Sequence, residues 1–171
     1  MINNTDLHSG NHTTRIAIHQ LIQVMNANGE DGPVVEKLML TPHQTLQVVA
    51  SNPGMLELES TWLPGGSQPR THWHSTQREH FEVLEGELTV EIDGQPVRVL
   101  RPSETLHVPP RTAHRMWNAS TELTRASWRV TPAQRTEKMF RTIAGGLNPV
   151  TSMVLLWTYR REMRLGKPRQ A

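Results

Sequence analysis

The order of apolar and polar residues predicts a β domain in the middle of the chain. From Val34 to about Val130, short runs rich in Val, Leu, Thr and Trp are separated by clusters of Pro, Gly and Asn. These clusters recur about every eight to twelve residues, a spacing typical of short strands joined by tight turns. We therefore predict an all-β domain over residues 34–130.

One hairpin can be placed within this domain. Apolar and polar residues alternate on both sides of the dipeptide Asp93-Gly94, which favours a two-residue turn. Residues two apart on a strand point to the same face. The alternation therefore predicts a hairpin with one buried face. The apolar positions are Leu88, Val90 and Ile92 before the turn, and Val97 and Val99 after it.

The two ends of the chain have different patterns. Within residues 13–28, apolar residues at Ile18, Leu21, Ile22 and Met25 have helical spacing, although the β-branched content would also suit a strand. We predict that residues 1–33 form a partly helical N-terminal extension.

The C-terminal part, residues 131–171, is expected to be helical. The stretch Thr131-Pro132-Ala133-Gln134 has the pattern of a capping box with Pro at the first helical position. A second helix is expected to open at Asn148-Pro149. Its apolar residues, such as Val154 and Trp157, surround the helix, so we predict that it is buried, either on the barrel or across a dimer.

Composition limits the chemistry that is available. The 171 residues include no Cys, which excludes disulfides, zinc ribbons, iron–sulfur centres and thiol nucleophiles. Nine His residues are present, and His is the commonest ligand for transition metals. Any metal ion must therefore be bound by nitrogen and oxygen atoms.

The charge is divided unevenly along the chain. Residues 1–128 carry nine Lys and Arg against fourteen Asp and Glu, a net −5, whereas residues 129–171 carry nine against two, a net +7. A basic tail is a feature of nucleic-acid-binding proteins. The second predicted helix is apolar nearly all round, however, and a recognition helix exposed in a groove would not be. We predict no nucleic-acid partner. Opposite charges could instead meet between two copies, so a homodimer is expected.

The sequence shows no apolar run of about 18 residues and no leader pattern at its start. We therefore predict a cytoplasmic protein without a membrane partner.

The candidate chemistry is concentrated between residues 66 and 86. On a strand, His72 and His74 project from the same face. Glu79 follows after a bend and can return to the same point, and His114 could add a third imidazole. Three nitrogens and one oxygen suit one divalent transition metal ion, Fe, Mn, Ni, Cu or Zn, rather than calcium or magnesium.

These residues resemble a known family. The spacing Gly66-x5-His72-x-His74-x4-Glu79-x6-Gly86 matches the first motif of the cupin superfamily at every fixed position. Pro109, His114 and Asn118 match the second motif. The resemblance spans about residues 55–130 and is closest to the small single-domain cupins of the cupin 2 type.

Two positions depart from the family pattern. Ser103 and Arg111 stand where the second motif has glycines. Those glycines serve turns with positive φ, a conformation that costs other residues about 1 kcal/mol or more. We therefore expect the two turns to differ in shape from the family's.

The resemblance implies a fold and a function. The expected fold is a cupin jelly-roll β-barrel, also called a double-stranded β-helix, with helical N- and C-terminal additions. The resemblance implies His72, His74, Glu79 and His114 as metal ligands, and a quercetinase-like dioxygenase acting on a small aromatic or oxygen-rich molecule. Glu79 could also act as a general base. The alternatives are a non-catalytic cupin that binds a sugar, acid or phenolic ligand, and a metal-dependent isomerase.

Further side chains are assigned from their positions. Trp62, Met116 and Trp128 could line the substrate pocket, although large aromatic residues in a small barrel could equally belong to its core. His80 and His107 neighbour inward positions and are expected to face outward. Gln77 and Arg78, in the bend before Glu79, are expected to be exposed loop residues. The positions of His8, His12, His19 and His43 outside the motifs predict solvated side chains.

Overall fold

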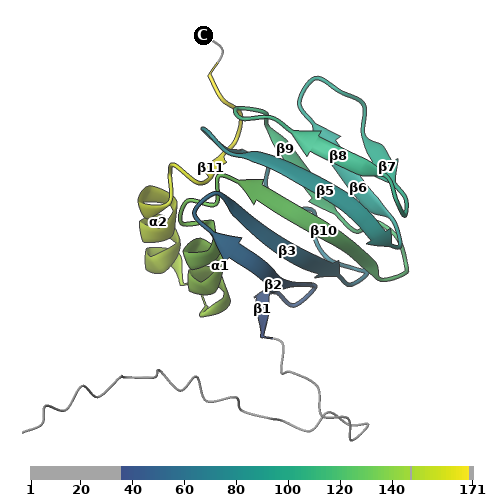
Figure 1. Cartoon of the computed structure of the whole chain (residues 1–171), viewed down its shortest axis with the longest axis horizontal. Helices are drawn as coiled ribbons and strands as arrows, with labels where there is room; N and C mark the ends of the chain where they lie inside the picture. Colours follow the sequence, from purple (N-terminus) through teal and green to yellow (C-terminus); the bar gives the residue numbers. More distant parts are fainter. Residues whose placement is uncertain (1–35, 147, 170–171) are drawn as a thin grey trace, which may run out of the picture. The chain divides into compact units, whose positions relative to one another are not determined.

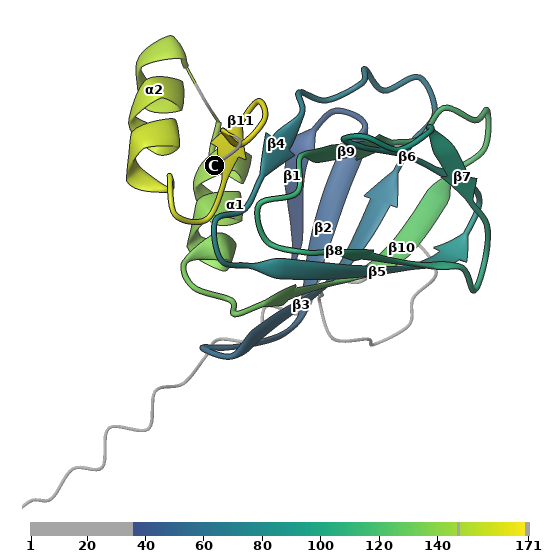
Figure 2. The same cartoon turned by 90° about the horizontal axis from the view of Figure 1, so that it is seen from above.

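The architecture consists of two antiparallel sheets and two short helices. The computed structural model describes residues 36–146 and 148–169, so the predicted helix within residues 13–28 lies outside the described residues. Figures 1 and 2 show the two sheets as facing layers. One sheet has the strand order β1-β2-β3-β10-β5-β8 and the other β11-β4-β9-β6-β7. The predicted all-β jelly roll is confirmed.

The strands are mostly short, as the turn spacing predicted. The six-stranded sheet contains β1 (Lys37–Thr41), β2 (Gln44–Asn52), β3 (Met55–Trp62), β10 (Thr124–Thr131), β5 (Arg78–Glu85) and β8 (Thr105–Val108). The five-stranded sheet contains β11 (Arg164–Leu165), β4 (His72–Trp73), β9 (His114–Trp117), β6 (Leu88–Ile92) and β7 (Arg98–Leu100).

β3 and β10 lie in the middle of their sheet, and their alternating residues give them one buried face. Every second residue of β3 is buried, and the intervening residues are half-buried on the outer face. There Glu57 accepts a hydrogen bond from Arg129 Nε at 2.9 Å, and Glu59 accepts one from Arg125 Nη2 at 2.7 Å. The inner face thus supplies the core, and the outer face carries cross-strand ion pairs.

The predicted hairpin is present, but the face of its return strand was wrongly predicted. The strands β6 and β7 pair with Leu88 opposite Leu100 and Thr89 opposite Val99. Leu100 is therefore buried in the core, whereas Val97 and Val99 are 56% and 41% exposed. The connection between β6 and β7 is longer than the predicted two-residue turn. The buried position of β7 is therefore shifted by one residue from the predicted one.

The first C-terminal helix begins later than predicted. Helix α1 spans Thr136–Ala144 rather than starting at Pro132. Thr131 still pairs with Arg78 in the sheet, and Gln134 has a φ of 49°, so neither residue can belong to a right-handed helix. Tertiary pairing therefore overrides the local capping pattern.

The second helix, α2 (Pro149–Thr158), begins where the sequence predicted, but most of its apolar residues are not buried on the barrel, and burial across a dimer stays a prediction. Leu155 and the following Tyr159 belong to the hydrophobic core. Four other apolar residues lie largely in solvent: Val150 (71%), Met153 (75%), Val154 (57%) and Trp157 (71%). No helix of the described residues is long and apolar enough to cross a membrane.

Candidate metal centre

Three His side chains meet at two neighbouring strands, β4 and β9, inside the five-stranded sheet. His72 lies in β4 directly opposite His114 in β9, and His74 follows β4 by one residue. One ring nitrogen from each residue lies within 4.8 Å of the other two. His74 and His114 are buried, whereas His72 is half-buried. The cluster is a candidate metal site with one accessible side.

The outer ring nitrogens show which nitrogens face the centre. Nδ1 of His114 lies 3.0 Å from the Thr112 carbonyl oxygen, and Nδ1 of His72 lies 3.4 Å from that of Arg70. Nδ1 of His74 contacts the carbonyl oxygen of Glu162. A carbonyl only accepts hydrogen bonds, so each Nδ1 carries the proton and each Nε2 offers a lone pair.

Glu79 faces the same point from the other sheet. Its Oε2 lies 2.8 Å from His114 Nε2 and 3.2 Å from His74 Nε2. Its Oε1 accepts a hydrogen bond from Trp128 Nε1 at 3.1 Å. The carboxylate is thus held at one oxygen by the indole, while the other oxygen points at the imidazoles.

The donor atoms suit a metal ion. Nε2 of His74, Nε2 of His114 and Oε2 of Glu79 are buried and have no hydrogen-bond partner among the described residues apart from their ion-pair contacts with one another. Buried polar atoms without such partners are costly, and a cation would satisfy all three at once. Imidazole and carboxylate donors match a transition metal ion.

The protonation equilibria of the cluster reflect the burial and the close approach of its four side chains. Burial, followed by the nearby His114, lowers the pKa of His72 to about 3, so its ring is neutral at neutral pH. Burial raises the pKa of Glu79, but the electrostatic influence and close contacts of His74 and His114 outweigh burial and hold that pKa well below its usual range. Burial lowers the pKa of His74, yet the neighbouring Glu79 carboxylate raises it overall.

The residues predicted to line a substrate pocket are divided between two places. Trp62 and Met116 line a cavity of about 170 Å³ together with Trp117. Trp128 instead packs between Phe81 and Phe140, with ring centroids 5.2 Å from each, and donates to Glu79. Trp62 and Trp128 are 6% and 9% exposed, so both also belong to the core. Their contact with a substrate stays a prediction.

The histidines outside the cluster lie apart from it. His80 and His107 face outward, as predicted, and pair across β5 and β8 with their Nδ1 atoms 3.2 Å apart. His43 Nδ1 contacts the Pro64 carbonyl oxygen at 2.9 Å. His8, His12 and His19 lie outside the described residues.

Sequence reasoning misjudged Gln77 and missed Glu162. Gln77 is 1% exposed rather than a loop residue in solvent, and its Nε2 donates to the carbonyl oxygens of Pro132 and Ala133 and to Thr136 Oγ1. Glu162 is 2% exposed and contacts His74 through its backbone. The one available signal was that Glu162 is one of only two acidic residues in the basic tail.

The two positions that depart from the family motif keep the conformation of the glycines they replace. Ser103 has a φ of 71° and Arg111 a φ of 62°. The expectation that these turns differ in shape is therefore wrong at the level of backbone conformation. Arg111 N also donates to the His74 carbonyl oxygen at 2.7 Å, so this turn supports the segment that carries His74.

Comparisons with known proteins show similarity to cupin domains. Residues 58–129 match the family described as "Cupin domain". Quercetin 2,3-dioxygenase of Bacillus subtilis is 35% identical over 79 residues, which cover 44% of this chain and 23% of that protein. The probable oxidoreductase yanE of Aspergillus niger is 47% identical over 49 residues, 29% of this chain and 19% of that protein. The chain thus spans about a fifth of the length of these curated relatives.

A solved structure supports the fold. The RmlC-like cupin from Shewanella frigidimarina superposes with a TM-score of 0.54 and 20% sequence identity, over 63% of this chain and 93% of that chain. At this level of identity the similarity concerns the fold alone.

Proposed function

Because this chain carries a cupin domain and has the cupin superfamily fold, we propose that it is a mononuclear metal-dependent oxidoreductase of the dioxygenase type. The proposed substrate is a small aromatic or oxygen-rich organic molecule. One observation carries the proposal: one ring nitrogen each of His72, His74 and His114 converges, while each Nδ1 is engaged with a backbone carbonyl. The distant relatives with oxidoreductase and quercetin dioxygenase names support the reaction class.

The three imidazoles and Glu79 would hold one divalent transition metal ion. When bound, such an ion acts as a Lewis acid that polarises substrate oxygen atoms. His72 is half-buried, whereas the other two rings are buried, so a substrate would approach from the His72 side. The assignment of all four residues as ligands is part of the proposal.

Glu79 is the proposed general base. Its carboxylate is ionised at neutral pH, which is the state that a base requires. Once Oε2 is released from the ion, that oxygen would be free to accept a substrate hydroxyl proton. The Trp128 indole holds Oε1, which restricts rotation of the carboxylate and directs Oε2 to the centre. The surrounding core excludes water from this side of the cluster.

The first prediction concerns metal content. His72→Ala and His114→Ala should each abolish stoichiometric metal binding, because each removes one converging nitrogen. The measurement is elemental analysis of untagged protein after challenge with a weak chelator. His107→Ala is the matched control, since it removes an exposed imidazole outside the cluster, and it should keep full metal content. Full retention of metal by His72→Ala would contradict the proposed site.

The reaction class needs a separate assay. After reloading with Fe(II), Mn(II) or Ni(II), oxygen uptake should appear with some of a panel of phenolic and diketone substrates, and Glu79→Gln should reduce it. Tight phenol binding without uptake in any metal form would overturn the dioxygenase proposal and favour a non-catalytic binding cupin.

A further inference from the structure

The segment after α2 returns to the strand that carries the metal-site histidines. It pairs with β4 as β11, with Leu165 opposite His72 and Arg164 opposite Trp73. The neighbouring contacts are Gly166 N to the Thr71 carbonyl oxygen at 2.8 Å and Ser75 Oγ to the Arg161 carbonyl oxygen at 2.7 Å. This segment lies outside residues 58–129, which match the cupin domain.

The same segment supplies the hydrogen-bond partner of one candidate ligand. The Glu162 carbonyl oxygen accepts the Nδ1–H of His74, although the two residues are 88 positions apart. His72 and His114 use carbonyls only two residues away, at Arg70 and Thr112. Within the cluster, the tautomer and ring orientation of His74 therefore depend on a remote part of the chain.

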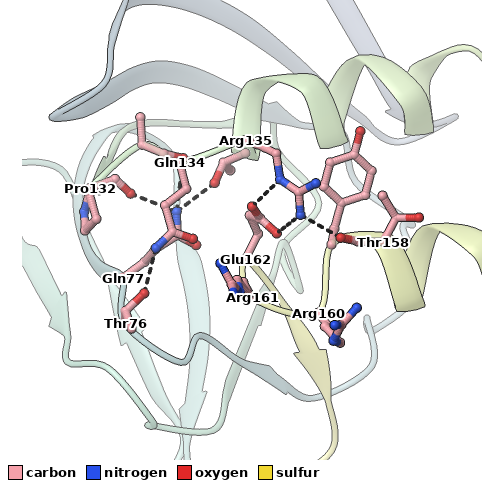
Figure 3. A network of polar contacts seen from close by, with 12 residues as sticks. Thr76, Gln77, Pro132, Gln134, Arg135, Thr158, Arg160, Arg161 and Glu162 are labelled. Atoms are coloured by element: carbon pink, nitrogen blue, oxygen red, sulfur yellow. Dashed lines mark hydrogen bonds and ion pairs between the residues drawn. The ribbon is translucent and has the colours of Figure 1, made fainter.

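An ion pair between the exposed Arg135 and the buried Glu162 carboxylate holds Glu162 in place. Figure 3 shows Arg135 facing the Glu162 carboxylate, with Nε 2.9 Å from Oε1 and Nη2 3.1 Å from Oε2. Arg135 Nη2 also donates to the Thr158 carbonyl oxygen at 2.6 Å, and its guanidinium lies over the Tyr159 ring. The carboxylate is 2% exposed, so breaking this two-point contact leaves a buried charge unpaired.

The residues next to Arg135 in the sequence hold the loop that follows His74. Gln77, three residues after His74, donates to Pro132, Ala133 and Thr136. Gln134 Nε2 donates to Thr76 Oγ1 at 2.7 Å, which is also visible in Figure 3. The connection between β10 and α1 thus contacts both the loop that follows His74 and Glu162, whose carbonyl oxygen orients the His74 ring.

We propose that the Arg135–Glu162 ion pair is a positioning device for the metal centre, which fixes the Glu162 carbonyl against His74 Nδ1. The inference rests on the proposed metal-binding function of the cluster. Under this proposal the C-terminal segment contributes to metal binding in addition to packing on the barrel. Both residues act through His74 and do not touch the metal or a substrate.

The test compares metal affinity in variants that keep every candidate ligand. Glu162→Gln retains the backbone carbonyl but removes the charge that Arg135 pairs with, and Arg135→Ala removes the partner. Each should weaken metal binding by about 10- to 100-fold in a chelator competition. Arg141→Ala is the matched control. It removes an exposed Arg from α1 that pairs with Glu36 and Glu137, and it should leave the affinity unchanged.

A readout on the metal-free protein separates this role from a merely structural one. In wild type, nitrogen NMR should show His74 protonated at Nδ1 with a hydrogen-bonded proton, and Glu162→Gln should lose that proton signal or show mixed tautomers. His72 and His114 should keep their tautomers, because their partners are local. An unchanged His74 signal together with wild-type metal affinity in both variants would overturn the inference.

Failure of the inference and failure of the proposed function give different results. If wild type itself binds no metal and His72→Ala behaves identically, the proposed function fails. If wild type binds metal and His72→Ala does not, but Glu162→Gln and Arg135→Ala bind as wild type does, only the positioning role fails. Should Arg135→Ala not fold, Glu162→Gln alone decides the question, since its neutral side chain still offers hydrogen bonds.

Discussion

At the scale of single residues, Gly86 shows why the motif that carries the metal-site residues ends on a glycine. Its φ is 73°, and a Cβ atom built there would lie 2.2 Å from the Leu123 carbonyl oxygen. Both the backbone conformation and the close approach of a neighbouring chain segment therefore exclude a side chain. Gly94, in the turn after β6, has a similar φ of 77° but nothing within 4 Å.

The two glycines give a matched pair of substitutions. Gly86→Ala should lower the free energy of unfolding by about 2–5 kcal/mol, because the cost of a positive φ adds to a steric conflict with backbone. Gly94→Ala should lower it by only about 1–2 kcal/mol, from conformation alone. Urea unfolding of both variants measures the difference. Equal losses would show that the backbone at Leu123 moves aside at little cost.

Ser103 and Arg111 keep positive φ values without being glycines. Their turns are therefore maintained by the surrounding contacts, such as the hydrogen bond from Ser103 N to the Val83 carbonyl oxygen at 2.8 Å. At these two positions a glycine would lower the conformational cost of the positive φ, but the turn forms without it.

At the scale of elements, the connections decide how the sheets are closed around the cluster. The loop between β4 and β5 is held against the β10–α1 connection by Gln77, whose amide faces two carbonyl oxygens and a hydroxyl. The Pro132 carbonyl oxygen is occupied by Gln77, and Gln134 has a φ of 49°, so the helix begins only after these residues.

Gln77→Ala should destabilise the fold by about 1–3 kcal/mol, because it removes the donor to the Pro132 carbonyl oxygen, whereas the Ala133 carbonyl oxygen keeps its hydrogen bond from Thr136 N. The control is Gln134→Ala, which removes an exposed amide from the same connection and should cost about 0.5 kcal/mol or less. Thermal unfolding of the two metal-free variants compares them. If Gln134→Ala lost as much stability as Gln77→Ala, Gln77 would not be the main contact between the β4–β5 loop and the β10–α1 connection.

At the scale of the whole molecule, helix α2 presents an apolar face that the other described residues do not cover. We define this α2 face by Val150, Met153, Val154 and Trp157, which are 57–75% exposed. A contiguous exposed apolar face of this kind marks an interaction surface. The net +7 of residues 129–171 against the net −5 of residues 1–128 favours a second copy of the chain as the partner. The homodimer remains a prediction.

Disruption of the α2 face tests the dimer directly. Sedimentation velocity should show a dimer for wild type and a monomer for the double variant Met153→Glu with Val154→Glu, because burying two carboxylates in an apolar interface is unfavourable. Val97→Glu changes an apolar residue that is 56% exposed elsewhere and should leave the dimer intact. A wild-type monomer across the accessible concentration range would contradict the prediction.

The local pattern of the sequence determined a large part of this protein. Alternation and turn residues predicted the β domain and the hairpin, because strand periodicity and turn conformation depend on a few neighbouring residues. The two-residue spacing of His72 and His74 likewise placed both rings on one side of the chain. The resemblance to the two cupin motifs, rather than spacing alone, added His114 and Glu79, and the three histidines meet with Glu79 beside them.

Tertiary structure decided the features that depend on contacts between distant residues. Pairing with Leu88 decided that Leu100, not Val99, enters the core. The orientation of the His74 ring depends on Glu162, 88 residues away, and the exposure of α2 depends on what the rest of the described fold can cover. No local pattern encodes these outcomes, because they follow from register, packing and buried hydrogen bonds that exist only once the chain has folded.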